Sequence, residues 1–489
     1  MWQDKTLHPK RNTQKPHHVF LLTVLAMWGT LLLGHMLVWR GEVTCNSCSK
    51  GSTRNSNFQE TLAGPFQDAW DEFNQVESPV QWSEPLPSKA KLMEALFSVA
   101  SLPPLHPVNE TCRPPPLDPY PICSGGTGLT GSLLEHPRRI VHMVMLGFEV
   151  DTLEIMLREE LDVVDVIFLV EATRSHNTRG EEPRATKPLV WDRLKYTSRF
   201  DFVPKKKVIH IVVDDVEMLS ALTASKQDNF AVEDLQTLAG IERIKYWDAT
   251  VGGLYGTDVF ISGDVDEVPS RETLYRLRWC ELAGPVTSSA LWMPMGSLDR
   301  AYLDDRMAPD LPYTFSSPTI YLWSSILSGQ HDGTRLTHNA TLQERRIKYV
   351  TGGIHMTNHA MLAHVMLKEL SATSYAANAP TCAYTLALLN KEQQDRYALK
   401  MQPELLDLVV PLEALDKQYD GWLRFVPWFL NCNRRRFPYW FGQPDPRNQA
   451  LLYALKQVAS GRDSSIVAHM YHFKKLMRAN TSTAIYDRV

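Results

Sequence analysis

Strand-like and helix-like segments alternate along the middle of the chain. Apolar runs predict buried strands at Arg139–Leu146, Val166–Val170, Lys207–Val213 and Val259–Ser262. Apolar residues at helical spacing predict helices at Asp151–Val164, Leu235–Trp247 and Arg271–Glu281. Ser270 can cap the last of these helices. The alternation favours an α/β fold in which helices cover both faces of a mainly parallel sheet.

The N-terminal region follows a different pattern. Val19–Trp39 contains 21 residues without Asp, Glu, Lys or Arg, which is long enough to cross a bilayer as one helix. A cleaved signal peptide is the alternative, but the apolar run is long and no clear small-residue cleavage site follows it. Basic residues in the short preceding tail, such as Lys10 and Arg11, favour a cytosolic tail and a type II single-pass topology.

Between this segment and the globular region the composition shifts to Pro, Ser, Gly and Asn. That composition is typical of a stem, apart from a candidate short helix at Lys89–Leu102. The predicted organisation is a tail (1–18), a membrane anchor (19–39), a lumenal stem (40–137), a globular domain (138–455) and a C-terminal extension (456–489).

Composition narrows the class of partner and the compartment. The formal net charge of -4, without a long basic tract, argues against a nucleic-acid partner. Sequons at Asn109, Asn339 and Asn480 agree with a lumenal body that carries N-glycans. The chain has seven cysteines, so in an oxidising compartment at least one thiol is free or bridged to another chain. A homodimer is therefore one possible assembly. The pairing of the cysteines cannot be read from their spacing.

An acidic turn follows the last predicted strand. Val259–Ser262 runs into Asp264, Asp266 and Glu267, and open α/β sheets bind ligands at the carboxyl ends of their strands. Two carboxylates one residue apart can hold a divalent cation, and the cation can hold a diphosphate. The turn therefore indicates a metal-assisted reaction on a phosphate-bearing substrate.

Four segments resemble blocks of glycosyltransferase family 17. They are Phe148–Asp165 with Phe168–Glu171, Asp258–Arg271 with a helix ending at Trp279-Cys280, Gly352–His355 with Lys368 and Ser371, and Pro427–Phe441. The first two blocks are long and specific, whereas the last two are degenerate. The resemblance covers about Arg138–Phe441 and leaves out the stem.

The resemblance implies a Golgi membrane enzyme with a GT-A-like nucleotide-sugar-binding fold. Such an enzyme transfers GlcNAc with inversion from UDP-GlcNAc to a mannose of an N-glycan or glycoprotein acceptor, in a β-1,4 bisecting-type linkage. It also implies Mn²⁺ or Mg²⁺ held by a D-x-D motif against the donor diphosphate, where the cation neutralises the leaving group. A different acceptor glycan remains an alternative.

The resemblance assigns roles to particular residues. Asp264 and Asp266 are the metal candidates. Asp266, Glu267 and Glu171 are the catalytic candidates, and Glu149, Asp151, Arg271 and His355 are the substrate-binding candidates. Purely structural roles remain open for several of them, namely helix capping for Glu149 and Asp151, an N-terminal helix acid for Glu267 and an ion pair for Arg271.

Two further points concern the acceptor half of the site. The family has Trp before and Cys after the histidine, where this chain has Ile354 and Met356, so acceptor recognition departs from the family pattern. An inverting transfer needs a general base, and the sequence leaves it unassigned, with Asp299, Asp304 and Asp305 on a predicted acceptor-side loop.

Two other classes of protein compete with a transferase. Asp264–Val268 also fits the first motif of haloacid-dehalogenase phosphatases, in which the first Asp is a nucleophile. That motif normally lies on the first strand of its domain, whereas three strands are predicted before it here. A catalytically inactive, membrane-tethered carbohydrate-binding protein is the third class.

Overall fold

The computed structural model describes residues 89–124, 126–176, 186–214, 231–295, 297–301, 314–334, 348–357, 361–371, 410–411, 425–441, 445, 447 and 451. All of them belong to one compact unit, Trp70–Val489. None of the helices within these ranges is long and apolar enough to cross a membrane. The predicted span Val19–Trp39 lies outside them, as do Cys45, Cys48 and Cys382.

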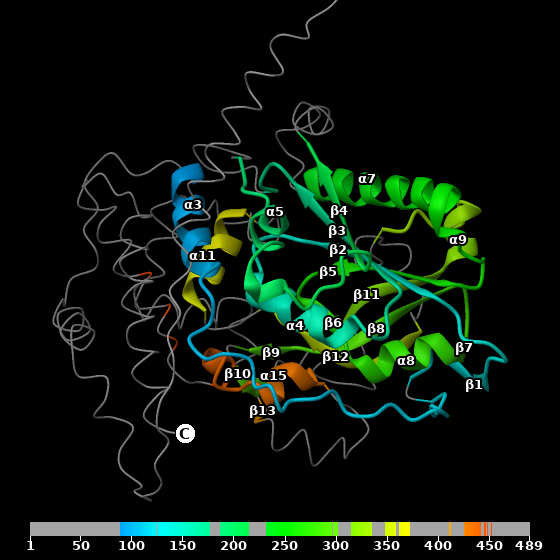
Figure 1. The fold of residues 1–489 in the computed structure, drawn as a ribbon. Coiled ribbons are helices and arrows are strands. Elements are labelled where there is room, and N and C mark those ends of the chain that lie inside the picture. The colour runs from blue at the N-terminus through cyan, green and yellow to red at the C-terminus, as the bar shows by residue number, and fades with distance from the viewer. Residues whose placement is uncertain are drawn as a thin grey trace, which may run out of the picture. The chain divides into compact units, whose positions relative to one another are not determined.

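A mixed sheet forms the centre of the described unit (Figure 1). Its strands lie in the order β4 (Val208–Val213), β3 (Val166–Ala172), β2 (Ile140–Met145), β5 (Val259–Asp264), β11 (Thr314–Leu322), β8 (Val286–Trp292), β12 (Tyr349–His355) and β6 (Glu267–Pro269). The strands from β4 to β5 are parallel, and so are β8 and β12. β11 is antiparallel to both of its neighbours, and β6 is antiparallel to β12. The α/β class with a mainly parallel sheet is thus confirmed, while the antiparallel β11 was not predicted.

Helices pack on both faces of the parallel half of the sheet, as the alternation of elements predicts. Figure 1 shows α7 (Ala231–Trp247) on one face, and α4 (Val150–Glu160) and α8 (Arg271–Trp279) on the other. Successive side chains of β2 point to opposite faces of the sheet, because side chains alternate along a strand. Ile140 and Val144 pack in the core that contains α4, whereas Val141 and Met143 pack in the core that contains α7.

The remaining elements are shorter or lie at the margins of the sheet. They are α3 (Lys89–Ala100), β1 (Leu129–Leu133), α5 (Val190–Leu194), η2 (Ser198–Phe200), η3 (Asp248–Gly252), β7 (Cys280–Leu282), β9 (Pro294–Met295), β10 (Ser297–Ala301), α9 (Trp323–Leu327), α11 (Leu362–Ser371), β13 (Val410–Pro411), α15 (Trp428–Cys432) and η7 (Pro438–Phe441). The predicted cap of α8 is confirmed, because Ser270 Oγ accepts a hydrogen bond of 3.2 Å from the Thr273 amide.

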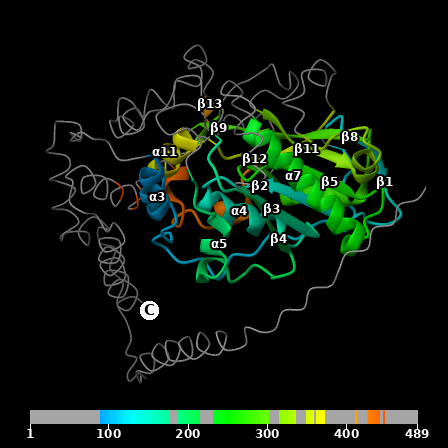
Figure 2. The same cartoon turned by 90° about the horizontal axis from the view of Figure 1, so that it is seen from above.

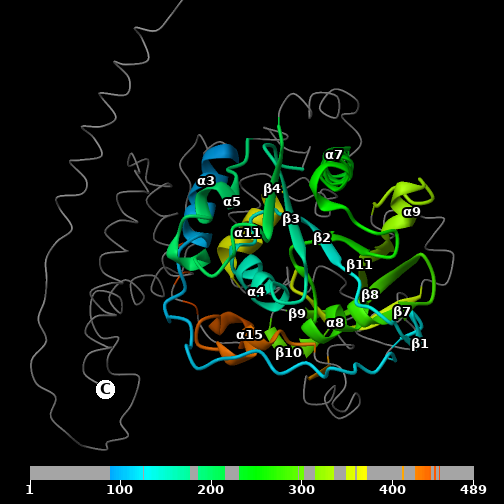
Figure 3. The ribbon, with the colours of Figure 1, turned by 45° about the vertical axis from the view of Figure 1, so that its right-hand side comes forward.

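Part of the predicted stem packs against the globular domain. α3 lies beside α11 in Figures 2 and 3, and its apolar residues belong to the same core as α4. Disulfides join Cys112 to Cys432 and Cys123 to Cys280. The packed domain therefore begins at or before Lys89, and a chain shortened to residue 138 would lack one partner of each disulfide.

We expect these two disulfides to contribute measurably to stability. Cys112–Cys432 closes a loop of 320 residues and Cys123–Cys280 a loop of 157, and crosslinks across long loops restrict the unfolded chain strongly. Replacing Cys123 and Cys280 together by serine should lower the free energy of unfolding by about 2 to 4 kcal/mol. Denaturant titration measures this loss. Peptide mapping without reduction should recover both pairs, and different pairings would contradict the assignment.

Candidate functional site

The acidic turn lies where the strand order of the sheet reverses. β3 and β4 extend to one side of β2, whereas β5 lies on its other side, and ligands bind at the carboxyl ends of strands at such a point. Asp264 is the last residue of β5 and pairs in register with Met145, the last residue of β2. The Val265 amide then donates to the Met145 carbonyl at 3.0 Å, which fixes the turn that carries Asp266.

Asp266 is the centre of the site. Its side chain is only 2% exposed, and its Oδ2 accepts a hydrogen bond of 2.5 Å from Lys368 Nζ. Its Oδ1 is buried, has no hydrogen-bond partner among the described residues and lies 3.7 Å from His355 Nε2, which is too long for a hydrogen bond. Burial alone would raise the pKa of Asp266, but Lys368 and His355 together hold the pKa well below its usual range. The carboxylate is therefore ionised, with Oδ2 paired to Lys368 and Oδ1 facing His355.

The backbone of β12 places His355 beside Asp266. Gly352 and Gly353 have φ angles of 119° and 117°, and a Cβ on Gly353 would lie 2.4 Å from the Val268 carbonyl oxygen. Glycine alone fits this close approach, which lets β12 pair with β6 and sets His355 opposite Glu267. The imidazole stacks on Phe315 with ring centroids 4.4 Å apart. The glycine pair of the third block therefore determines where the histidine lies.

Glu149 follows β2 and lies close enough to Asp266 and Lys368 for their charges to act on it. Its side chain does not cap α4, and Oε2 instead accepts a hydrogen bond of 2.6 Å from the Phe148 amide. Burial raises the pKa of Glu149, and Lys368 opposes this while Asp266 adds to it. Glu149 thus lies close to Asp266, Lys368 and His355, and we call these four residues the Asp266 group.

Asp264 and Glu267 flank Asp266 in different surroundings. Glu267 is buried, and its Oε2 accepts a hydrogen bond of 3.0 Å from the Asp264 amide. A Cβ on Gly263 would lie 2.5 Å from Pro318 Cβ and 2.7 Å from the same oxygen, so a glycine is needed there. Glu267 therefore stabilises the turn through this hydrogen bond, whereas the side chain of Asp264 is partly exposed at the end of β5.

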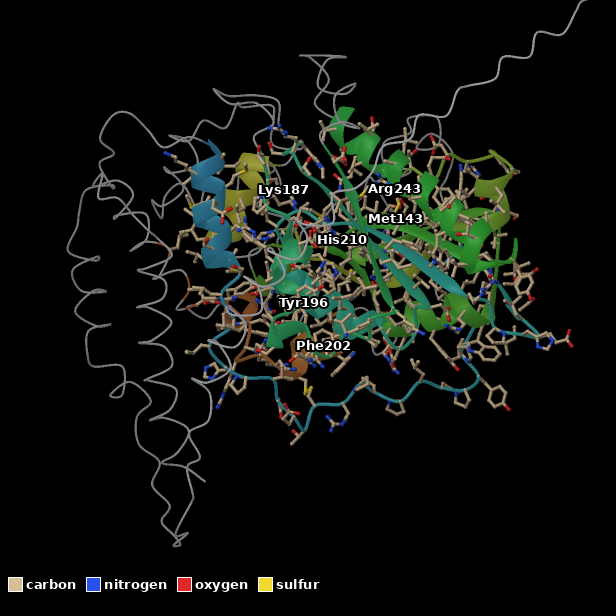
Figure 4. All side chains as sticks on the ribbon, turned by 45° about the horizontal axis from the view of Figure 1, so that its top comes forward. Met143, Lys187, Tyr196, Phe202, His210 and Arg243 are labelled. Atoms are coloured by element: carbon tan, nitrogen blue, oxygen red, sulfur yellow. A yellow bond between two sulfur atoms is a disulfide. The ribbon has the colours of Figure 1, made fainter. Side chains whose placement is uncertain are left out.

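Glu171 is held by donors of its own. Its carboxylate accepts hydrogen bonds from the amides of Val190 and Trp191, the first residues of α5, at 2.7 and 2.9 Å. It also forms an ion pair with Lys187 at 3.1 Å, and His210 Nε2 lies 2.9 Å from its Oε2; Figure 4 labels Lys187 and His210. These contacts anchor the start of α5, and none of them joins Glu171 to Asp266.

The side chain of Arg271 contacts the segment that follows α4 and part of the segment that was predicted to be a stem. It donates Nε to Asp162 Oδ2 at 2.7 Å and Nη1 to the Pro115 carbonyl at 2.6 Å. The alternative of a structural ion pair is therefore the arrangement observed, and the expected contact of Arg271 with the acids of the turn is not.

Asp151 belongs to a buried ion network. Arg447 donates to both of its oxygens, at 2.9 and 2.6 Å, and Arg199 pairs with Oδ1 at 2.5 Å. Tyr439 donates its hydroxyl to Oδ2 at 2.9 Å. Burial alone would raise the pKa of Asp151, but Arg447 and Arg199 outweigh it and lower the pKa. With both oxygens occupied, the carboxylate joins α4 to the C-terminal segment and is not part of the Asp266 group.

Several other predictions fall wholly or partly outside the described residues. Asn339, Asn480, Asp304 and Asp305 lie outside them, and the side chain of Asp299 is not described. Asn109 is described and exposed, and its Oδ1 accepts a hydrogen bond of 2.8 Å from the hydroxyl of Thr111 in the same sequon. The asparagine is thus accessible for modification.

Lys368 is the site residue that the sequence analysis did not single out. It appeared there only as part of the third block. A usable signal existed, because α11 is otherwise largely apolar and buried, and a lysine in such a helix needs a partner.

The donor atoms around Asp266 fit a divalent cation bound with help from a ligand. Within the described ranges, no group of three or more His, Cys, Asp or Glu side chains is arranged to hold a metal. Asp266 Oδ1, which has no hydrogen-bond partner within these ranges, nevertheless lies 3.7 Å from His355 Nε2, and two ligands of one cation are about 3 to 4 Å apart. The protein could supply these two ligands, and a diphosphate could complete the set.

A buried carboxylate beneath the site gives a prediction for pH dependence. Glu159 accepts hydrogen bonds from the Arg271 amide at 3.0 Å and the Trp428 amide at 3.1 Å. Burial raises the pKa of Glu159 from 4.5 to about 8, although both amides oppose the rise. Between these values the unfolded chain releases the proton and the folded protein keeps it, so stability should fall as pH rises.

Glu159→Gln tests this assignment because it removes the titrating group. Relative to the variant, the wild type should lose up to about 1.4 kcal/mol of unfolding free energy per pH unit within that window. Denaturant titrations at several pH values measure the difference. Parallel curves for the two proteins would show that the pKa of Glu159 is not raised.

Comparison with known proteins supports the family resemblance. Residues 129–298 match the model of glycosyltransferase family 17, a region that includes β2, β5 and the acidic turn. The β-1,4-mannosyl-glycoprotein 4-β-N-acetylglucosaminyltransferases of Rattus norvegicus and Homo sapiens are each 28% identical to this chain over 148 residues. The matched segment covers 29% of this chain and 24% of each relative. The chain thus contains a region, residues 129–298, that is similar to glycosyltransferase family 17.

Proposed function

We propose that this glycosyltransferase family 17 chain is an inverting N-acetylglucosaminyltransferase. Its donor would be UDP-GlcNAc and its acceptor a mannose of an N-glycan, in β-1,4 bisecting-type linkage. The observation that carries the proposal is the buried Asp266 carboxylate, with its unpartnered Oδ1 near His355, inside the region that matches the family. The names of the relatives support the sugar and the acceptor class.

The mechanism follows from the charges that surround Asp266. Mn²⁺ or Mg²⁺ held by Asp266 and His355 would neutralise the charge that develops on the leaving UDP. Asp266 is suited to this because its low pKa keeps it ionised. Asp264 lies beside it at the end of β5, and Glu149 lies between β2 and α4, where we assign it to the donor nucleoside. The general base stays unassigned, because Asp304 and Asp305 lie outside the described residues and the side chain of Asp299 is not described.

We further propose a GT-A type fold and a location in the Golgi membrane, with the catalytic domain in the lumen. The strand order around β2 and β5 supports the fold. The two disulfides and the exposed Asn109 support an oxidising, glycosylating compartment. The apolar segment Val19–Trp39 supports anchoring through one helix.

Incubating the purified chain with a panel of UDP-sugars and N-glycan acceptors tests the proposal. We expect GlcNAc transfer to a mannose, and linkage analysis of the product should find a β-1,4 bond. Transfer of GlcNAc to another sugar would replace the proposed acceptor and keep the reaction type. Absence of transfer from every donor would contradict the function.

A further inference from the structure

Lys368 lies in a helix that is otherwise packed against the core. The neighbouring α11 residues Met366, Leu367 and Leu370 are fully buried. The side chain of Lys368 is 13% exposed, and its ammonium lies 2.5 Å from Asp266 Oδ2. Burying an ammonium group is costly without a partner. The carboxylate of Asp266 supplies that partner.

The two oxygens of Asp266 consequently have different surroundings. Oδ2 binds Lys368, whereas Oδ1 is buried, has no hydrogen-bond partner in the part of the chain that the structure describes and lies 3.7 Å from His355 Nε2. Without a nucleotide, a divalent cation that arrives at Oδ1 meets a carboxylate whose charge is already neutralised by an ammonium group. It is also repelled by that ammonium group, since both lie on the same carboxylate.

A nucleoside diphosphate changes this balance. Its phosphates bring the negative charge that Lys368 has cancelled at Asp266, and they offer oxygen ligands to the cation. Cation and nucleotide should therefore each strengthen the binding of the other, and the strength of this coupling is reciprocal.

We propose that Lys368 is the internal counter-ion of Asp266 and makes cation binding depend on the sugar nucleotide. It is a positioning residue that keeps the empty site from holding a cation and aligns Asp266 for the loaded one. The inference rests on the proposed function, because it assumes a nucleotide donor at this site.

The inference is tested by measuring how tightly the full chain binds Mn²⁺ with and without UDP. Electron paramagnetic resonance of free Mn²⁺ measures this binding. Wild type should bind Mn²⁺ at least tenfold more tightly with UDP than without it. Lys368→Met should bind Mn²⁺ without UDP at least tenfold more tightly than wild type, whereas Lys368→Arg should resemble wild type. Lys187→Met is the matched control, since it removes a buried lysine from another carboxylate, Glu171, and should leave Mn²⁺ binding unchanged.

The outcomes separate this inference from the proposed function. Equal Mn²⁺ affinity of wild type with and without UDP, when UDP itself binds, would overturn the role of Lys368. The same holds if Lys368→Met folds and binds Mn²⁺ no more tightly than wild type. If Lys368→Met does not fold, Lys368→Arg must keep the UDP dependence, and its loss would overturn the role. Failure of wild type to bind UDP under any condition would instead contradict the proposed function.

Discussion

Replacing Asp266 by asparagine is expected to lower the turnover of UDP-GlcNAc by about 10²- to 10³-fold, the usual cost of losing one preorganised charge-stabilising group. Asparagine keeps the size of the side chain but loses the negative charge that would hold a cation. It also leaves the ammonium of Lys368 without its ion-pair partner, 2.5 Å away in the wild type. The loss should appear in kcat/KM and should not be recovered by added Mn²⁺.

The matched control is Asp201→Asn, at an exposed aspartate outside the site, which should retain wild-type turnover. Thermal unfolding of both variants shows whether they are folded. A folded Asp266→Asn protein with wild-type kcat/KM would remove Asp266 from the mechanism.

Replacing Asp151 by asparagine should cause one of the largest losses of stability that a single substitution produces in this chain. Asp151 is 4% exposed and forms ion pairs with Arg447 and Arg199. The nearby Glu154 forms ion pairs with Arg199 and Arg436. Loss of the Asp151 charge leaves buried guanidinium groups without full compensation. Breaking such a buried pair costs about 3 to 5 kcal/mol, and denaturant titration measures the loss.

The exposed ion pair between Glu94 and Arg193 is a control for this prediction. Both side chains are about half exposed, and Glu94→Gln should change the free energy of unfolding by no more than about 1 kcal/mol. A loss for Asp151→Asn as small as that expected for Glu94→Gln would show that the Asp151 network does not stabilise the fold.

The parallel half of the sheet could be predicted because its local pattern is strong. β2 is an apolar run interrupted by His142, and α4 and α8 carry apolar residues at helical spacing, so short windows of sequence are sufficient. The other half lacks this signal. β8 and β11 contain serine pairs within otherwise apolar strands, and only their antiparallel partners make them a sheet.

Contacts between distant residues set the limit for the rest of the fold. The segment that looks like a stem packs on the domain through α3 and two disulfides, whose partners are 320 and 157 residues apart. No spacing rule identifies such pairs, and a composition rich in Pro and Ser conceals the packing.

The candidate site divides in the same way. The acidic turn after β5 was visible in sequence, and the family pattern pointed to His355. Lys368 was missed because its partner is 102 positions away and no local pattern links the two. Asp151 and Arg271 belong to the same matching blocks as the site residues, but their contacts hold the scaffold together. Sequence position alone could not separate these roles.

Release of UDP from UDP-GlcNAc by the purified full chain tests the central claim most directly. We expect slow release with Mn²⁺, loss of release with a chelator, and loss in Asp266→Asn. A phosphatase would instead release phosphate from a simple aryl phosphate, and an inactive carbohydrate-binding protein would do neither. Release by wild type that is equal to release by Asp266→Asn would contradict the account.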